Sequence, residues 1–316
     1  MANLFKQIDR WLSGPEIAIF HKFQKPPYGG GNQFLLALSK ELRNRRIDVG
    51  NNTVGKKTKA AIFNSFEFDK KKFKGYRKKF NTRMVQRLAG PIGVYRGEDT
   101  TIDRDLWELN GEYADATIFI SNWSYNKYHE IGLVFKEPHV ILNASDPEIF
   151  HRKERVSPPD GKRKIKLIAT AWSDNPRKGG SLLSWVDEHL DHSRYELTFV
   201  GRTHAQFKMA KVIEPVPSLE LADILRQHDI YIAPSLDDPC SNALVEALTC
   251  GLPTAFVRSG GHPELVNEGG EGFDSESNVL SAIDKIAANY SHYQSKISNP
   301  SMKETANEYL KALRIN

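Results

Sequence analysis

Short apolar runs alternate with helix-spaced apolar residues along the first half of the chain. The run EIAIFH at 16–21 predicts a strand, and prolines and a triple glycine at 29–31 follow it. Phe34, Leu35, Leu38 and Leu42 then recur at the spacing of one helix face. We expect further strands at 59–63, 84–88, 116–121 and 139–143, with a helix near 125–131. This alternation is typical of βα units around a parallel sheet.

The second half repeats the pattern. Strands are expected at 165–170, 195–200, 230–233 and 253–257, and helices at 180–190, 219–227, 242–250, 279–288 and 302–313. A charged, proline-containing segment at 151–164 separates the halves and suits an exposed linker. The chain is therefore predicted to be α/β, with Rossmann-like domains at 1–155 and 156–316. The last helix is a candidate to pack back on the first domain.

Composition supports a globular protein of two domains. The 316 residues are 40% apolar and 26% charged. Cys240 and Cys250 are the only cysteines, too few for a disulfide framework or for a zinc site. No apolar run approaches the ~20 residues that span a bilayer. Charged residues within the first ten positions also argue against a secretory signal, so we expect a cytoplasmic protein.

Positive charge is concentrated in the first half of the chain. Residues 1–155 hold 27 Lys and Arg against 18 Asp and Glu, whereas the remainder carries a net charge of −4. Seven cations at 70–79 are interleaved with Phe73, Tyr76 and Phe80. The stretch is either a solvated basic segment or a peripheral contact with the anionic inner face of a membrane. Leu4, Phe5, Ile8, Trp11 and Leu12 form a helical pattern that either lies in a membrane interface or packs on the body. We expect no nucleic-acid partner.

The densest chemical signal lies between Pro234 and Gly251. Asp238 follows a predicted strand, and Glu246 lies two turns into the next predicted helix. The helix N-terminus at Ser241, Asn242 and Ala243 offers free N–H groups for a phosphate, with Ser241 or Asn242 as N-cap.

This segment resembles the retaining, nucleotide-sugar-dependent glycosyltransferases of family 4, which have the GT-B fold of two Rossmann-like domains facing each other across a cleft. Their E-x7-E motif corresponds to Asp238 and Glu246. The other matches run over nearly the whole chain: Gly251 and Pro253, Ser259-Gly260-Gly261, Lys178-Gly179, Val200-Gly201, the segment at 142–150 and the glycine loop at 29–31.

The resemblance implies roles for individual residues. Lys178, assisted by Arg177 or Arg202, would contact the donor diphosphate, where negative charge develops during transfer. Glu246 would bind the ribose hydroxyls and Asp238 the hydroxyls of the donor sugar. Gly30, Gly31, Gly260 and Gly261 would allow the backbone to approach the ligand closely.

The sequence also departs from the family. The first acid of the motif is Asp238, which is one methylene shorter than Glu. The arginine usually found shortly before the lysine is absent, and Gln86 and Arg87 stand where relatives often carry a histidine. Arg87, Arg96 and His21 remain acceptor-side candidates.

The remaining motifs do not indicate a metal or cofactor site. Asp103 and Asp105 resemble a D-x-D metal motif, but three-residue matches arise by chance. The glycine loop lacks the third glycine of a dinucleotide fingerprint, and there is no P-loop. We therefore expect no metal and no cofactor.

Together these features predict a retaining transferase that moves a sugar from a UDP- or GDP-sugar to a glycan, a lipid-linked or another hydroxyl acceptor, in polysaccharide biosynthesis. Two alternatives stay open. One is a weak or inactive sugar-nucleotide-binding partner subunit, and the other is an epimerase or hydrolase of the same fold.

Overall fold

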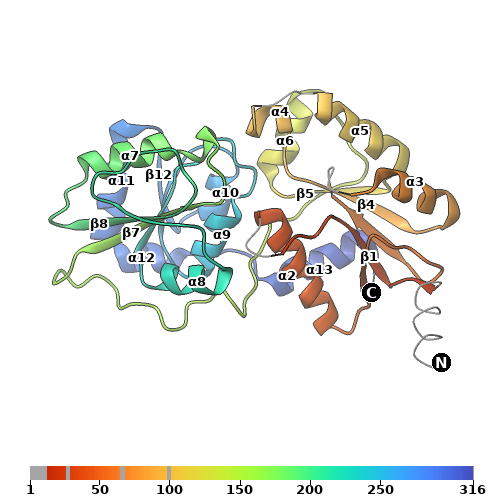
Figure 1. The fold of residues 1–316 in the computed structure, drawn as a ribbon, viewed down its shortest axis with the longest axis horizontal. Coiled ribbons are helices and arrows are strands. Elements are labelled where there is room, and N and C mark those ends of the chain that lie inside the picture. Colours follow the sequence, from red (N-terminus) through yellow and green to blue (C-terminus); the bar gives the residue numbers. More distant parts are fainter. Residues whose placement is uncertain (1–12, 26–28, 65–67, 98–100, 316) are drawn as a thin grey trace. The chain divides into compact units, whose positions relative to one another are not determined.

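The computed structural model describes residues 13–25, 29–64, 68–97 and 101–315, so the N-terminal apolar pattern at 4–12 lies outside it. The chain forms two compact units (Figure 1). The first unit contains the described residues up to Gln24, Leu35–Leu142 and Met302–Asn316, and the second contains Lys25–Phe34 and Asn143–Ser301. The chain returns to the second unit at Asn143, upstream of the segment at 151–164 where the sequence suggested a boundary.

The first unit is built on a six-stranded parallel sheet in the order β2-β1-β3-β4-β5-β6. Its strands are β1 (Ile17–Phe20), β2 (Val49–Asn51), β3 (Ala60–Phe63), β4 (Arg83–Leu88), β5 (Ala116–Phe119) and β6 (Pro138–Val140). Its helices are α2 (Gly30–Asn44), α3 (Lys70–Lys79), α4 (Ile92–Tyr95), α5 (Thr101–Tyr113), α6 (Asn122–Glu130) and α13 (Met302–Leu313). The first residues of α2 belong to the second unit.

Aromatic side chains fill the core beneath α3. Phe73 is the buried residue of this helix, and its ring lies 5.1 Å from that of Phe20 and 4.7 Å from that of Phe63. Tyr113 at the end of α5 completes the cluster, with its ring 5.7 Å from that of Phe73. The packing of these rings fixes α3 against the sheet, because each buries a large apolar surface.

The second unit repeats the architecture with a parallel sheet in the order β12-β11-β10-β7-β8-β9. Its strands are β7 (Ile165–Ala171), β8 (Tyr195–Gly201), β9 (Lys211–Ile213), β10 (Ile230–Ala233), β11 (Thr254–Val257) and β12 (Gly270–Phe273). Its helices are η1 (Pro176–Lys178, 3₁₀), α7 (Gly180–His189), α8 (Ser218–Arg226), α9 (Asn242–Thr249), α10 (His262–Val266), α11 (Glu276–Ala288) and α12 (Tyr290–Lys296). The predicted α/β class is confirmed.

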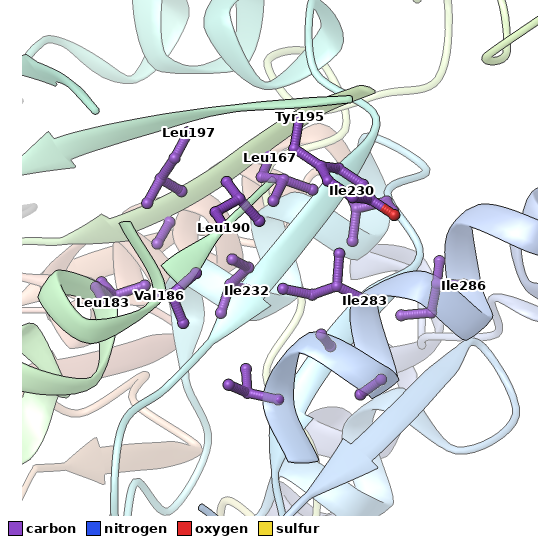
Figure 2. Packing of buried hydrophobic residues seen from close by; sticks show 14 of the residues in the cluster. Leu167, Leu183, Val186, Leu190, Tyr195, Leu197, Ile230, Ile232, Ile283 and Ile286 are labelled. Carbon is purple, nitrogen blue, oxygen red and sulfur yellow. The ribbon is translucent and has the colours of Figure 1, made fainter. Parts of the chain in front are cut away.

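Branched aliphatic residues from strands and helices form the core of this unit. Ile230 and Ile232 of β10 pack with Val186 of α7 and with Ile283 and Ile286 of α11 (Figure 2). Successive parallel strands are buried on both faces, which explains their near-continuous apolar runs in the sequence.

Each sheet has one point where the strand order reverses. In the second sheet the order reverses between the neighbouring strands β7 and β10, and in the first between β1 and β3. Ligands of open α/β sheets bind beyond the carboxyl ends of the strands at such a point. The loops after β7 and β10 are therefore the first place to look for chemistry in the second unit.

The charged segment before β7 is anchored rather than free. The Arg155 guanidinium donates hydrogen bonds to the carbonyl oxygens of Cys250 and His228 and to the hydroxyl of Tyr290. Cys240 and Cys250 are both buried free thiols, and burial raises the pKa of Cys250 to about 12. In the described part of the chain, no helix is long and apolar enough to cross a membrane.

Candidate functional site

Three loops meet at the carboxyl edge of the second sheet and are tied together by their backbones. The backbone N–H of Leu236, in the loop after β10, donates a hydrogen bond to the carbonyl oxygen of Arg177, in the loop after β7, at 2.8 Å. The loop after β10 is held in turn by the loop after β11, since Gly261 N donates to Asp238 O at 2.9 Å. The side chains on these loops therefore have defined positions.

An ion pair joins two of the expected site residues. Lys178 Nζ lies 2.7 Å from Asp238 Oδ2, with the carboxylate almost buried and the ammonium partly exposed. Burial alone would raise the pKa of Asp238, but the charge and hydrogen bond of Lys178, the charge of His262 and the backbone N–H of Cys240 together outweigh burial, and the pKa lies below its usual value. Asp238 is therefore an ionised acceptor, and Lys178 is a cation beside it.

Arg177 points to a different carboxylate. Its guanidinium pairs with Asp237 Oδ2 at 2.7 Å, and Asp237 N donates to Ser259 Oγ at 2.9 Å. Gly260, with a φ of 62°, lies against this loop, where a Cβ would come within 2.2 Å of Asp238 O. Both Arg177 and Gly260 thus hold the loop that carries Asp238.

Arg202 is held by an aromatic ring. Its guanidinium carbon lies 4.3 Å from the centre of the Trp172 ring, and among the described residues it makes no ion pair. Arg202 and Lys178 line one cavity of about 180 Å³, together with Ser173, Asp174, Asn175, Ser181, Thr203 and His204. Two cations thus face one space in which a polyanion would fit.

Glu246 lies in the wall of a second cavity of about 110 Å³ in the same unit. Burial raises the pKa of Glu246 to about 8, and among the described residues its carboxyl group has no hydrogen-bond or ion-pair partner. It is therefore a neutral acid at pH 7. The other lining residues include Gly29, Gly30, Gln33, Thr170, Trp172, Gly201, Pro215, Val216, Asn242 and Ala243.

The N-terminus of α9 directs Asn242 and Ala243 to this second cavity. Ser241 is the N-cap, as one of the two predictions had it, and its hydroxyl accepts from Leu244 N at 3.4 Å. Gly30 is close by, since a Cβ there would lie 2.3 Å from Asn242 Nδ2, whereas a Cβ on Gly31 would meet nothing within 4 Å.

Two residues near the site carried no sequence motif. Trp172 joins the two cavities, because it lines the second and supports Arg202 of the first. His262 is fully buried, with Nε2 3.2 Å from Ser235 Oγ, and burial lowers its pKa. An aromatic residue three positions before an NPRK turn was the available signal for Trp172.

The first unit brings only some of its candidates together. His21 lies beyond β1, where its Nδ1 is 3.4 Å from Asn64 Nδ2, and Arg87 donates to Asn64 Oδ1 at 3.3 Å. Arg96 is exposed and lies over Tyr95 instead.

Asp103 does not form a metal pair with Asp105. It is buried and accepts from the backbone N–H groups of Ile92 and Gly93 at 2.7 and 3.0 Å, whereas Asp105 is exposed. Among the residues that the structure describes, no three His, Cys, Asp or Glu are grouped to hold a metal ion.

The family model for glycosyl transferases group 1 matches residues 175–291, which include Lys178, Asp238 and Glu246. Curated relatives match the chain in part: the sulfoquinovosyl transferase SQD2 of Arabidopsis thaliana is 23% identical over 40% of this chain and 26% of its own length. The MMP alpha-(1->4)-mannosyltransferase of Mycolicibacterium hassiacum is 29% identical over 42% and 34%. The matches thus span a quarter to a third of these relatives.

Solved structures match this chain over almost its full length. Anabaena HepE in complex with UDP and glucose superposes with a TM-score of 0.70 at 15% identity, covering 95% of this chain and 100% of that one. The catalytic domain of starch synthase IV from Arabidopsis thaliana, bound to ADP and acarbose, gives 0.70 at 11% identity, covering 96% and 99%. The chain has the GT-B fold.

Proposed function

We propose that this chain is a glycosyltransferase that moves a sugar from a nucleoside diphosphate sugar to a hydroxyl acceptor. The observation that carries the proposal is the pairing of Lys178 with Asp238 at a strand-order reversal, next to the cavity lined by Glu246. The group 1 match over this segment and the UDP in the HepE structure support it.

In this proposal the diphosphate of the donor binds to Lys178 and Arg202, and the sugar of the donor binds to Asp238. Lys178 and Arg202 neutralise the diphosphate, Asp238 accepts hydrogen bonds from the sugar hydroxyls, and Glu246 meets the ribose hydroxyls. As a neutral acid, Glu246 can both donate and accept hydrogen bonds, and it does not repel the phosphates.

In the reaction, the bond between the sugar C1 and the β-phosphate oxygen breaks, and the acceptor oxygen bonds to C1 on the same face. The departing phosphate takes the acceptor proton, so no side-chain base is required. Lys178 and Arg202 stabilise the negative charge that develops on that phosphate, a contribution that is largest where water is excluded. In this proposal no metal ion is needed for that charge.

The first experiment is to measure binding of UDP and GDP in EDTA by thermal shift, followed by turnover of the matching nucleotide sugars. A ligand at 100 times its Kd should stabilise the chain by about 2.7 kcal/mol. We expect one nucleotide to bind, Glu246→Ala to abolish that binding, and the sugar donor to be consumed in the presence of acceptor.

The outcomes separate the alternatives. Binding without turnover, with any glycan or lipid-linked acceptor, would favour the partner subunit, an alternative suggested by Asp238 in place of Glu and by Gln86 in place of a histidine. Consumption of donor without acceptor would favour a hydrolase or epimerase. Absence of binding to either nucleotide would overturn the proposed function.

We further propose that the acceptor is a glycan or a lipid-linked hydroxyl compound that contacts the first unit. The basis is the polar cluster of His21, Asn64 and Arg87 at the strand-order reversal of the first sheet. Substitution of Asn64 by Ala is the test, because it should raise the KM for the acceptor and leave the Kd for the donor nucleotide unchanged.

A further inference from the structure

Helix α3 presents a dense set of lysines to solvent. Six of its ten residues are exposed lysines, namely Lys70, Lys71, Lys72, Lys74, Lys78 and Lys79. At about 100° per residue they cover an arc of about 200° opposite Phe73, the residue that anchors the helix in the core. One whole face of this helix is therefore cationic.

This charge is not neutralised within the described residues. None of the six ammonium groups makes an ion pair there, and the helix contains no acidic residue. The nearest contacts are aromatic: Lys72, Lys74 and Lys79 lie 5.2–5.8 Å from the ring centres of Tyr76, Tyr113 and Phe80. The positive field of α3 is thus directed outward.

The arrangement opposes helix stability. Lys70, Lys71 and Lys72 occupy the first turn, where the helix dipole disfavours cations. Lys70 and Lys74, and Lys74 and Lys78, are like charges four residues apart, which repel each other. A helix that only needed to cover the sheet would be more stable with acidic residues at these positions, so the lysines indicate a binding role.

The chemistry of the patch indicates the kind of partner. Its only arginine, Arg77, is held by both carboxylate oxygens of Asp115, at 3.0 and 2.7 Å, and by the Thr82 carbonyl. The aromatic residues of α3 point toward the core, where they cannot stack on bases. Lysine ammonium groups act as point charges without geometric specificity, which suits a diffuse anionic surface better than an individual phosphate group.

We propose that α3 holds the protein at an anionic lipid bilayer through its lysine face. Each lysine close to such a surface contributes about a fivefold gain in affinity, and the attraction weakens as salt screens it. The proposal does not depend on the transferase activity, because it rests on the first unit alone.

The test is co-sedimentation of the full chain with vesicles of phosphatidylcholine containing none or about 30% phosphatidylglycerol. The test variant is Lys70→Gln, Lys71→Gln, Lys78→Gln, three residues for which the structure records no side-chain contact. The matched control, Lys153→Gln, Lys162→Gln, Lys164→Gln, removes the same charge from exposed positions of the second unit.

We expect salt-sensitive binding to the anionic vesicles, a loss of about 100-fold in the α3 variant and little change in the control. The melting temperature of the α3 variant should be unchanged or higher, which excludes unfolding as the cause. Absence of binding to anionic vesicles, or an equal loss in the control, would overturn the proposal. Tighter binding of single-stranded RNA than of vesicles at equal salt would overturn it as well.

Discussion

Arg202 and Arg177 differ in what already holds them, and this difference predicts different roles. Arg177 forms an ion pair with Asp237, whereas Arg202 packs on the Trp172 ring and lines the same cavity as Lys178. Arg202→Met should weaken UDP binding by about 10- to 100-fold but leave uridine binding unchanged, because one charge-assisted contact contributes about 1.5–3 kcal/mol. Isothermal titration of both ligands measures this.

The matched variant is Arg177→Met, which should lower stability rather than diphosphate affinity. Equal losses of UDP affinity in the two variants would argue against the assignment to Arg202. Restoration by Arg202→Lys would indicate that the charge is what matters.

The raised pKa of Glu246 predicts that the free energy of unfolding depends on pH. The folded chain holds a proton on this carboxyl group up to about pH 8, whereas the unfolded chain releases it near pH 4.3. The contribution of Glu246 to the free energy of unfolding should therefore fall as the pH rises from about 4.3 to about 8. Glu246→Gln lacks this loss, so its melting temperature should exceed that of the unmodified chain by more at pH 9 than at pH 5. A difference independent of pH would contradict the raised pKa.

The resemblance of the sequence to a known family pointed to Lys178, Asp238 and Glu246, and the structure pairs Lys178 with Asp238, while their roles stay predictions. It left Arg177 and Arg202 as alternatives. The two arginines have different partners in the structure, and the partner of Arg177, Asp237, is 60 positions away in the sequence. Such pairings depend on which loops the sheet brings together, and no spacing records this.

At the scale of elements, Gly179 is the residue that ends η1 and begins α7. It has a φ of 77°, and a Cβ would come within 2.6 Å of Pro234 O. Gly161 has the same φ, but a Cβ there would meet nothing within 4 Å. Gly161→Ala should cost about 1–2 kcal/mol from backbone strain alone.

Gly179→Ala should cost more than this, because the clash adds to the strain and displaces the loop that leads to Asp238. Urea unfolding of both variants compares the two costs directly. Nucleotide affinity should drop only in Gly179→Ala, and equal behaviour of the two variants would show that the close approach to Pro234 is unimportant.

Elements with a clear apolar pattern were mostly predictable, and the shortest strands were not. The expected helix at 302–313 coincides with α13, because buried residues such as Ala306, Tyr309 and Leu313 recur at helical spacing. Strands β2, β9 and β12 were missed, since β2 and β9 have three residues each and β12 contains two glycines. The helix α5 was also missed, although Leu106, Leu109 and Tyr113 carried its pattern.

On the scale of the whole molecule, the first unit is completed by the end of the chain. Arg83 Nε donates to Ala312 O at 2.9 Å, Arg87 Nε donates to the Tyr309 hydroxyl at 3.0 Å, and Arg45 Nη2 donates to Lys303 O at 2.7 Å. The sequence suggested that the last helix packs back on the first domain, and these contacts identify Arg45, Arg83 and Arg87 as residues that bind it.

Removal of residues 302–316 should therefore destabilise the first unit selectively. Hydrogen exchange should accelerate in β3 and β4, while β7, β8 and β10 of the second unit keep their protection. Uniform acceleration in both units would indicate that they unfold together, and unchanged exchange would mean that α13 contributes little.

The burial of both thiols also has a practical consequence. With Cys240 and Cys250 inside the second unit and the pKa of Cys250 at about 12, neither should react readily with maleimides at neutral pH. A cysteine introduced at an exposed position of each unit would then take up fluorophores site-selectively in an otherwise unmodified chain. Energy transfer between such labels could follow the distance between the units as nucleotide is added.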